Sequence, residues 1–334
     1  MKEQMAKNVR RGKQRRRRAK KRRTVLLILF CFLLTGFILS ANQNLLFDTF
    51  QKGIALFSKN DLKVQTEFQL DVTEIHSKNI LLLELETGKI LGEQQAREVI
   101  YPASLTKIMT ALVAVEQIED WDEIVQISPS IYDGLYAQEA SLAGFEPGEE
   151  VPIRDLLYGA LLRSGAECCL TLAEKVAGGE QAFVSLMNSR AKELGMRHTH
   201  FCNTTGLHQQ DHVSTVEDIA ILLKNALSND LFRQVFMTRW YQTESTEIHP
   251  DGLIFTSSVF ELMEAAGIYE STITGGKTGY TQEAGLCLAS LAHIEDKEYI
   301  LVTAKASGTP METPYHIWDA VSIYRQLSEW LSIF

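Results

Sequence analysis

The strongest constraint on this chain is a run of 18 residues without a charge, TVLLILFCFLLTGFILSA at residues 24–41. A helix of that length is about 27 Å long, which is just enough to cross the hydrocarbon core of a bilayer. Residues 1–23 precede it with 13 of the chain's 33 lysines and arginines and one acid, Glu3, for a net charge of +12. Because basic flanks stay in the cytoplasm, the sequence predicts a single-pass membrane protein with the remainder of the chain outside the cell.

Two other interpretations start from the same residues. The basic tail alone would suit a nucleic-acid or nuclear signal, but directly beside an apolar run it indicates membrane topology, so no nucleic-acid partner is expected. The apolar run could also be a cleaved signal peptide, which would give a secreted protein. Leu39-Ser40-Ala41 is a poor cleavage site, and the run exceeds the roughly 7–15 residues of a signal-peptide core. These points favour a retained anchor and leave cleavage open.

Charge and pattern divide the chain into four parts: a cytoplasmic tail (1–23), a transmembrane signal-anchor (24–41), a juxtamembrane stalk (42–70) and a globular domain (71–334). The 311 residues after the tail carry a net charge of −21, which suits surroundings different from those of the tail. The stalk has apolar residues at near-helical spacing. This predicts a short amphipathic helix, on the membrane or against the domain, or an undistinguished stalk. The apolar residues are Leu46, Phe50, Ile54 and Phe57.

Hydrophobic periodicity in the globular part predicts an α+β domain with an antiparallel sheet. Strands are expected at 79–86 and 89–93, joined as a hairpin, and at 275–281, 285–294 and 299–307, with a turn at Glu295-Asp296. Helices are expected from Ser104 to about Ile118, within 152–178, at 181–194 before Gly195, over DIAILLKNAL after a capping box at 214–217, and at 313–331.

The cysteines indicate no redox or metal chemistry. Cys31 lies in the predicted span, and Cys168, Cys169, Cys202 and Cys287 show no C-x-x-C spacing. We interpret the last four as small buried apolar residues. A disulfide between Cys202 and Cys168 or Cys169 stays open.

Two further groups of polar residues have ordinary explanations. His208 and His212 flank the sequence QQD, but no third ligand follows at metal spacing, so neither a metal nor another cofactor is expected. Asp218 lies just past the capping box, where a carboxylate interacts favourably with the helix dipole, so we do not assign it as a catalytic acid.

The stretch PASLTK places Ser104 three residues before Lys107, at the head of the apolar run IMTALVAV. At i and i+3 the two side chains share one face of a helix. A lysine buried against apolar neighbours has a lowered pKa, and a neutral amine beside a hydroxyl can activate it as a nucleophile. Alone this spacing is a weak signal, because it also fits a surface lysine in a first helical turn.

Two more stretches strengthen the interpretation. Lys277-Thr278-Gly279 opens a strand pattern; Lys and Thr can hold a carboxylate, and Gly lets a ligand approach the backbone. Ser164-Gly165-Ala166 interrupts a helical pattern between the other two stretches. Ser-x-x-Lys, a Ser-x-Asn-type element and Lys-Thr-Gly together are typical of penicillin-binding proteins and β-lactamases.

From about Asn79 onward the chain resembles the D-alanyl-D-alanine carboxypeptidases, the low-molecular-mass penicillin-binding proteins of the serine peptidase S11 family. The resemblance implies a penicillin-recognising fold, with an antiparallel sheet flanked by helices plus a helical cluster. It lies in four stretches: TGKILGEQQAREVIYPASLTKIMTALVA, LLYGALLRSGAECCLTLAEKVAGG, FVSLMNSRAKELGMRHTHFCNTTGL and GGKTGYTQEAGLCLASLA.

The resemblance also implies roles. Ser104 would be the acylated nucleophile, Lys107 its base, and Ser164 a proton relay to the leaving amine. Lys277 and Thr278 would hold the substrate's terminal carboxylate. The partners implied are a peptidoglycan stem peptide ending in D-Ala–D-Ala, and β-lactams as covalent inhibitors.

Backbone groups complete the implied site. The N–H groups of Ser104 and Tyr280 would form an oxyanion hole, in which each donor can be worth about 3 kcal/mol, and Gly279 would let the backbone come close to the substrate.

The chain departs from the family pattern in three places. Ala166 stands where the family usually has Asn, an amide that steadies the lysine and the substrate. The loop 203–206, NTTG, lacks the usual proline. Many relatives continue into a β-rich second domain with a C-terminal membrane helix, whereas this chain ends with the last predicted helix, and the N-terminal span would replace that anchor.

Three functions are therefore weighed. The first is a membrane-anchored carboxypeptidase acting on the cell-wall side. The second, a β-lactamase, is disfavoured because no Glu-x-x-Leu-Asn stretch lies between Ser164 and Lys277 to supply a deacylating glutamate. The third is a β-lactam-binding wall protein with weak or lost turnover, which Ala166 supports and the retention of Ser104, Lys107, Ser164 and Lys277 opposes.

Overall fold

A computed structural model describes residues 67–269 and 272–333. The predicted tail, the span and nearly all of the stalk lie outside these residues. Within the described part, every helix is too short or too polar for a membrane crossing.

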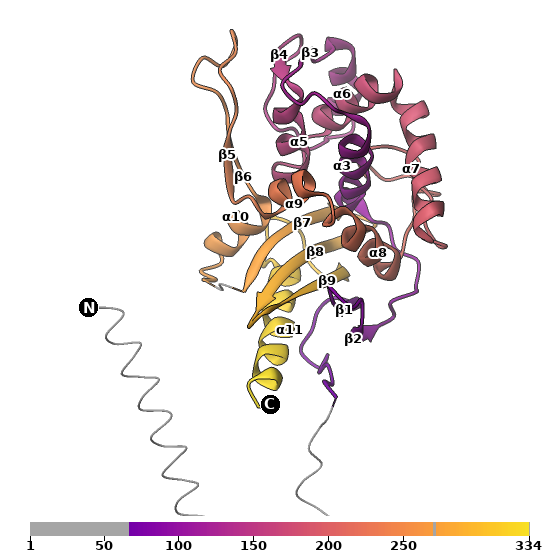
Figure 1. Ribbon diagram of the computed structural model, residues 1–334, viewed down its shortest axis with the longest axis vertical. Coiled ribbons are helices and arrows are strands. Elements are labelled where there is room, and N and C mark those ends of the chain that lie inside the picture. Colours follow the sequence, from indigo (N-terminus) through magenta and orange to yellow (C-terminus); the bar gives the residue numbers. More distant parts are fainter. Residues whose placement is uncertain (1–66, 270–271, 334) are drawn as a thin grey trace, which may run out of the picture. The chain divides into compact units, whose positions relative to one another are not determined.

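A five-stranded antiparallel sheet lies at the centre of the domain, with strands in the order β2–β1–β9–β8–β7 (Figure 1). The predicted N-terminal hairpin is present as β1 (Asn79–Glu84) and β2 (Ile90–Gln94). The three C-terminal strands are also present, as β7 (Ile273–Thr281), β8 (Gly285–Ile294) and β9 (Lys297–Ala306). Strand β1 pairs with β9, so the two ends of the domain meet in the middle of the sheet and β7 forms one edge.

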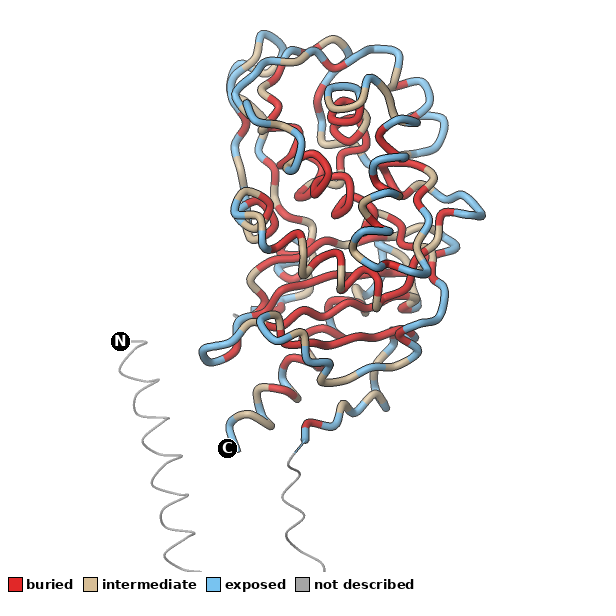
Figure 2. The backbone as a smooth tube through the Cα atoms, turned by 45° about the vertical axis from the view of Figure 1, so that its right-hand side comes forward, coloured by how far each residue is buried: buried red, intermediate tan, exposed pale blue. Residues whose placement is uncertain are grey.

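The alternation of side chains along β1 explains the layered architecture. All six residues of β1 are buried, because successive side chains point to opposite faces and both faces are covered. Ile80 and Leu82 join an apolar cluster with α10 (Ser258–Ala265) and α11 (Tyr315–Leu331). Leu81 and Leu83 join the larger cluster beneath the other helices. Figure 2 shows the sheet as a buried layer between the two.

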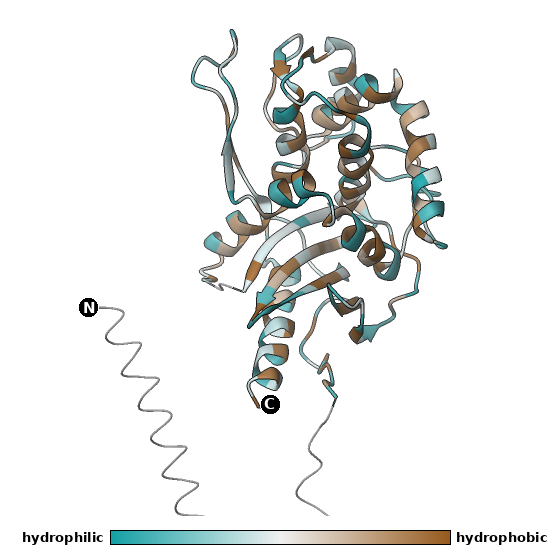
Figure 3. Ribbon diagram, in the orientation of Figure 1, coloured by the Kyte–Doolittle hydropathy of each residue, from teal (hydrophilic) through white to brown (hydrophobic). Residues whose placement is uncertain are grey.

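The helical cluster follows the predicted pattern. The expected helix 104–118 consists of a short 3₁₀ turn, η1 (Ala103–Leu105), and α3 (Thr106–Gln117). Helix α3 is the most apolar-looking helix of the cluster in Figure 3, and its residues 106–114 are all buried.

Region 152–178 divides at the predicted interruption into α5 (Ile153–Leu162) and α6 (Ala166–Ala177). Helix α7 (Glu180–Leu194) ends at Gly195, whose φ of 78° is the left-handed conformation that glycine favours.

One predicted cap was wrong by one residue. Helix α8 (Val216–Ala226) begins after Thr215, whose side chain accepts from the Asp218 amide at 3.0 Å. The Ser214 hydroxyl instead contacts Thr199, and the Glu217 carboxylate pairs with Arg97. Serine and threonine are both good N-cap residues, so the local sequence does not distinguish Ser214 from Thr215. The contact between Ser214 and Thr199, in loop 198–200, decides which of them caps the helix.

Short elements were not predicted, because strands of three residues and helices of eight or fewer leave too little periodicity to detect. They are β3 (Ile124–Gln126), η2 (Pro129–Ile131), α4 (Tyr132–Ala137), β4 (Glu150–Pro152), α9 (Asp230–Met237), β5 (Trp240–Gln242), β6 (Ile254–Thr256) and α10 (Ser258–Ala265). Strands β5 and β6 form the base of a hairpin that extends beside α5 (Figure 1).

Candidate active site

Ser104 and Lys107 meet at the start of α3, as their spacing predicts. Ser104 lies in the η1 turn and Lys107 in the first turn of α3, so one helical turn separates them. Their side-chain atoms Oγ and Nζ are 3.0 Å apart. The same Nζ donates to the Thr205 carbonyl at 2.6 Å. The lysine amine is thus held between a backbone acceptor and the hydroxyl.

Lys107 is buried, with 2% of its surface exposed. Burial lowers its pKa, because the charged form loses its hydration; the nearby Cys169 and Glu167 oppose this shift in part. Its two contacts suit a neutral amine, which can donate to the carbonyl and accept from the Ser104 hydroxyl.

The backbone around Ser104 is tightly constrained. Ala103 has a φ of 46°, in a region that non-glycine residues seldom adopt. Gly206 packs directly beneath it: a Cβ on Gly206 would lie 1.9 Å from the Ala103 carbonyl oxygen. Asn203 shapes this loop without a proline, since its Oδ1 accepts from the amides of Thr205 at 3.2 Å and Gly206 at 2.7 Å.

Strand β7 forms a second wall of the site, facing Ser104. Thr278 points toward α10, where its Oγ1 lies 2.7 Å from the Ser258 hydroxyl. A Cβ on Gly279 would lie 3.1 Å from the Ser104 amide nitrogen, so glycine leaves the space beside that N–H open. Gly279 precedes Tyr280, so this part of the β7 backbone lies close to the Ser104 amide.

Lys277 points to the other side of β7 and is fully buried. Its Nζ donates to the Thr278 carbonyl at 2.9 Å. Burial and the proximity of Lys107 lower its pKa well below the ordinary lysine value. Lys277 therefore lies behind the wall that Thr278 presents.

Ser164 lies in the turn between α5 and α6, with a φ of 62°. Its Oγ is buried and has no hydrogen-bond partner among the described residues. A strained backbone and an unpartnered hydroxyl at a cavity are features of a group awaiting a ligand.

The predicted residues Ser104, Ser164, Thr278, Gly279 and Tyr280 line one cavity of about 400 Å³. Lys107 and Lys277 are close to it but do not line it. The other lining residues, which the sequence did not suggest, are Glu139, Ser141, Arg163, Ser258, Glu261, Leu262, Leu286, Pro310, Pro314 and His316. The cavity is large enough for a short peptide end, and it exposes one activated hydroxyl.

Comparison with known proteins identifies the family. A sequence profile of the peptidase S11 family, whose description is D-alanyl-D-alanine carboxypeptidase, matches residues 63–308. The chain belongs to this family.

Several relatives of this S11 chain are named D-alanyl-D-alanine carboxypeptidases. D-alanyl-D-alanine carboxypeptidase DacF of Bacillus subtilis is 33% identical over 261 residues, which are 77% of this chain and 62% of DacF. DacA of Escherichia coli is 30% identical over 244 residues, 70% of this chain and 57% of DacA. The S11 chain therefore spans only about three fifths of the length of these relatives.

Solved structures confirm the predicted α+β penicillin-recognising fold. The Streptomyces K15 DD-transpeptidase is 29% identical, has a TM-score of 0.68, and is matched over 98% of its chain and 77% of this one. A D-alanyl-D-alanine carboxypeptidase from Mycobacterium tuberculosis has a TM-score of 0.66 over 80% of this chain; at 23% identity it supports the fold alone.

Ala166, the departure from the family pattern, begins α6 and is buried. Its amide donates to the Ser141 carbonyl at 2.8 Å, so the turn is held by its backbone although the side chain offers no polar group. The next residue, Glu167, is a buried carboxylate that sequence reasoning missed. A charged residue in the first turn of a helix is usually solvated, and only the fold shows that this one is buried.

The histidines considered as ligands have other contacts. His208 packs edge-on against Tyr101 and lies 3.8 Å from the Glu283 carboxylate. His212 is buried beneath Thr106: its Nδ1 accepts from the Cys202 amide at 3.1 Å, so its Nε2 carries the hydrogen and donates to the Thr106 hydroxyl at 2.8 Å. Within residues 67–269 and 272–333, no cluster of three potential metal ligands occurs.

Asp218 and the cysteines have structural positions. The Asp218 carboxylate accepts from the His198 amide and the Thr199 hydroxyl, which ties loop 198–200 to α8. Cys168, Cys169 and Cys287 are buried thiols, and Cys202 is half-buried; all four are free, so the disulfide left open for Cys202 is not formed.

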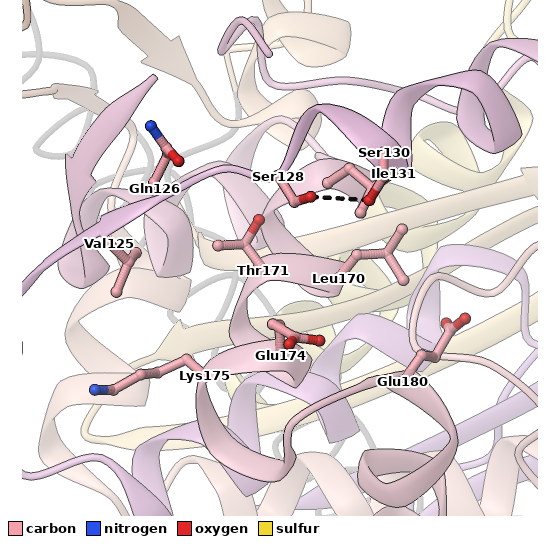
Figure 4. Close-up of a pocket in the computed structure, with 10 residues that line it drawn as sticks. All are labelled: Val125, Gln126, Ser128, Ser130, Ile131, Leu170, Thr171, Glu174, Lys175 and Glu180. Carbon is pink, nitrogen blue, oxygen red and sulfur yellow. Dashed lines mark hydrogen bonds between the residues drawn. The ribbon is translucent and has the colours of Figure 1, made fainter. Parts of the chain in front are cut away.

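A second hollow, of about 450 Å³, lies on the outer side of α6 (Figure 4). None of the predicted site residues lines it. Glu180, one of its lining residues, also accepts from the amide and hydroxyl of Thr204, next to the Thr205 carbonyl that holds Lys107. Glu180 thus links the edge of this hollow to the loop that holds Lys107.

Proposed function

We propose that this chain is a serine-type D-Ala–D-Ala carboxypeptidase, a hydrolase that removes the terminal D-alanine from peptidoglycan stem pentapeptides. The observation that carries the proposal is the 3.0 Å contact between a buried lysine amine, Lys107, and the Ser104 hydroxyl at the floor of an open cavity. Membership of the S11 family and the names of its relatives support the same reaction.

Acylation begins at Ser104. Neutral Lys107 takes the hydroxyl proton while Oγ forms a bond to the carbonyl carbon of the penultimate D-alanine. The amides of Ser104 and Tyr280 stabilise the oxyanion, which is the reason that the space beside Gly279 must stay free of a side chain.

The tetrahedral intermediate then collapses. The proton held by Lys107 passes through the Ser164 hydroxyl to the nitrogen of the terminal D-alanine, and the C–N bond breaks. The acyl-enzyme on Ser104 is hydrolysed by water, which Lys107 deprotonates in turn. A β-lactam would follow the first half of this sequence and remain attached, because its leaving group stays tethered to the acyl group.

Two groups hold the terminal carboxylate of the substrate. Thr278 presents a hydroxyl to the cavity, supported by Ser258 at 2.7 Å. Lys277 is fully buried behind the strand and does not line the cavity, so in its charged form it attracts the carboxylate through its positive potential rather than through a direct contact. Binding of an anion would raise the pKa of Lys277 and favour its charged form.

The location of the enzyme follows from its N-terminal sequence. We propose that residues 24–41 anchor the protein in the cell membrane and that residues 71–334 work on the cell-wall side, where peptidoglycan is found. The basic tail at 1–23 and the acidic remainder support this orientation.

A second candidate is a wall protein that binds β-lactams with little turnover. Ala166 favours it, because the side chain that the family uses to steady the lysine and the substrate is missing. If this loss limits the enzyme, the variant Ala166→Asn should raise the rate of D-alanine release. An unchanged or lower rate in a folded Ala166→Asn protein would remove the support for this candidate.

The deciding experiment uses the full chain in detergent, beside a Ser104→Ala variant. Each is incubated with a synthetic pentapeptide ending in D-Ala–D-Ala, with and without an amine acceptor, and with a fluorescent penicillin. Release and labelling that both vanish in the variant would support the carboxypeptidase. Labelling without release would favour the binding protein, and release only with the amine would indicate a transpeptidase. No labelling of the wild type would overturn the proposal.

A further inference from the structure

Two segments that line the active-site cavity are joined by a group of hydrogen bonds around Glu167. The Glu167 Oε1 accepts from the amide of Ala143 at 2.6 Å and from the amide of Gly144 at 3.1 Å. The amide of Ala166 donates to the carbonyl of Ser141 at 2.8 Å. These three bonds clamp segment 141–144 onto residues 165–167 of the turn that follows Ser164.

The two clamped segments also pack closely against each other. A Cβ on Gly165 would lie 2.8 Å from the Ala143 Cβ and 3.1 Å from the Ala143 amide nitrogen. The two backbones are thus in contact, and neither can move toward the other. The hydrogen bonds to Glu167 oppose separation of the two segments.

Glu167 is an unusual residue to find there. It is fully buried, and its second oxygen, Oε2, has no partner among the described residues. Burial raises its pKa, which the two amides and Lys107 partly counteract. Burying a carboxyl group with half its bonding capacity unused costs stability, which the bonds from the Ala143 and Gly144 amides offset in part.

Both clamped segments reach the cavity. Ser141 and Ser164 line it directly, and Ser164 lies one residue before the clamped turn. The backbone of Ser164 is in the left-handed region, which persists only where its surroundings enforce it. The hydrogen bonds at residues 166 and 167 fix the backbone that follows Ser164 and so help to hold it in this conformation.

We propose that Glu167 is a positioning residue: by holding segment 141–144 against the turn that follows Ser164, it sets the position of the Ser164 hydroxyl relative to Ser104. The inference rests on the proposed acylation of Ser104. It predicts that losing the acceptor at 167 slows acylation even when the protein stays folded.

The test compares variants that separate acceptor from charge. Glu167→Gln keeps an oxygen for the two amides and removes the charge, whereas Glu167→Leu keeps the volume and removes the acceptor. The control is Asp155→Leu. Asp155 is also a fully buried carboxylate in the first turn of a helix, but it accepts from the Tyr241 hydroxyl at 2.5 Å and the Glu244 amide at 3.0 Å, away from the cavity.

The readout is the second-order rate constant for labelling by a fluorescent penicillin, per folded full-length protein in detergent, with the folded fraction measured by thermal unfolding. Glu167→Leu should label about 10- to 100-fold more slowly than the wild type, as expected for a misplaced reacting group. Glu167→Gln should stay within about threefold of the wild type, and Asp155→Leu should lose thermal stability without slowing labelling. If Glu167→Leu fails to fold, Glu167→Asp, which withdraws the acceptor by one methylene, replaces it with the same expectation.

Two results would overturn the inference. One is labelling of folded Glu167→Leu, or of Glu167→Asp in its place, at the wild-type rate. The other is equal slowing in Asp155→Leu, which would indicate a general effect of instability. Absence of labelling in the wild type would instead contradict the proposed function, so the two failures are distinguishable.

Discussion

The two faces of the central sheet share their strands but bury different chemistry. On the α11 face, two buried polar side chains are well paired: the Asp319 carboxylate accepts from the Ser77 amide at 2.7 Å and hydroxyl at 2.6 Å, and the hydroxyls of Tyr324 and Ser290 are 3.0 Å apart. On the helical face, Lys107 and Lys277 are buried with carbonyl and hydroxyl contacts only.

The difference indicates which face provides stability and which provides reactivity. Paired buried groups add specificity at little cost, whereas buried amines without a carboxylate contact are held in a less favoured environment. Such an environment lowers the pKa of a lysine, so that the neutral amine, which can act as a base, is easier to form. The α11 face and the remaining core must stabilise the domain enough to tolerate this.

The largest effect that would test this contrast is the loss of the lysine base. Lys107→Ala should reduce the rate of penicillin labelling by about 10²- to 10⁴-fold, because Ser104 loses its proton acceptor. The variant should remain folded, since a buried amine is removed from an apolar setting. Labelling and circular dichroism measured together check this; near-normal labelling of folded protein would contradict the role of Lys107.

Acid stability offers the next test, with one histidine on each face. Burial lowers the pKa of His212, and of His316 on α11, to about 4. The unfolded chain binds these protons near pH 6.5, so stability falls as pH drops from about 6.5 to 4, by up to about 3 kcal/mol for each histidine. Asp155 and Glu167, whose pKa values are raised, act in the opposite direction.

Because these carboxyl groups act in the opposite direction, the contribution of each histidine is measured as the difference in acid stability between the wild type and a variant that lacks the histidine. Urea unfolding of His212→Gln and His316→Gln, at pH 7 and pH 5, should show a smaller acid loss than the wild type in each case. His212 should show the clearer change, because a proton on its Nδ1 would face the Cys202 amide that now donates to it. A wild-type-like pH dependence in both variants would contradict these assignments.

The pH profile of acylation is a smaller effect. Only neutral Lys107 can accept the Ser104 proton, so the labelling rate should rise about tenfold per pH unit below its pKa and level off above it. Because burial lowers that pKa from 10.5, the plateau should begin below pH 10.5. A rate still rising tenfold per unit at that pH would mean that the lysine is not desolvated in the working enzyme.

The smallest effect concerns the α11 face itself. Tyr324→Phe removes the hydroxyl that meets Ser290 and should cost about 1 kcal/mol of unfolding free energy. It should leave the labelling rate of folded protein unchanged, since α11 reaches the cavity only through its first turn. A slower rate in this variant would show that the two faces are coupled.

The sequence predicted the parts of this molecule that depend on local pattern. The i, i+3 spacing of Ser104 and Lys107 held, and so did the long strands and the break in the helices at Ser164. The choice of Thr215 over Ser214 as a cap could not be predicted, because loop 198–200 decides it.

The supporting residues of the site were missed for a related reason. Thr205, Gly206 and Glu167 act through contacts with residues 24 to 103 positions away, such as Lys107, Ala103 and Ala143. Nothing in their own neighbourhood marks them. A glycine in a loop and a glutamate at a helix start are ordinary until the fold supplies their partners.

The acceptor that holds Lys107 is a main-chain carbonyl, and this affects how the sequence can change. Every amino acid carries that group, so position 205 can change its side chain without releasing the lysine, at the expense of the hydroxyl contact to Asn203 at 3.2 Å. Position 206 has no such freedom, because any larger residue would collide with Ala103. In a library of all single substitutions selected for penicillin binding, many residues should therefore be accepted at position 205, whereas position 206 should accept almost none but glycine.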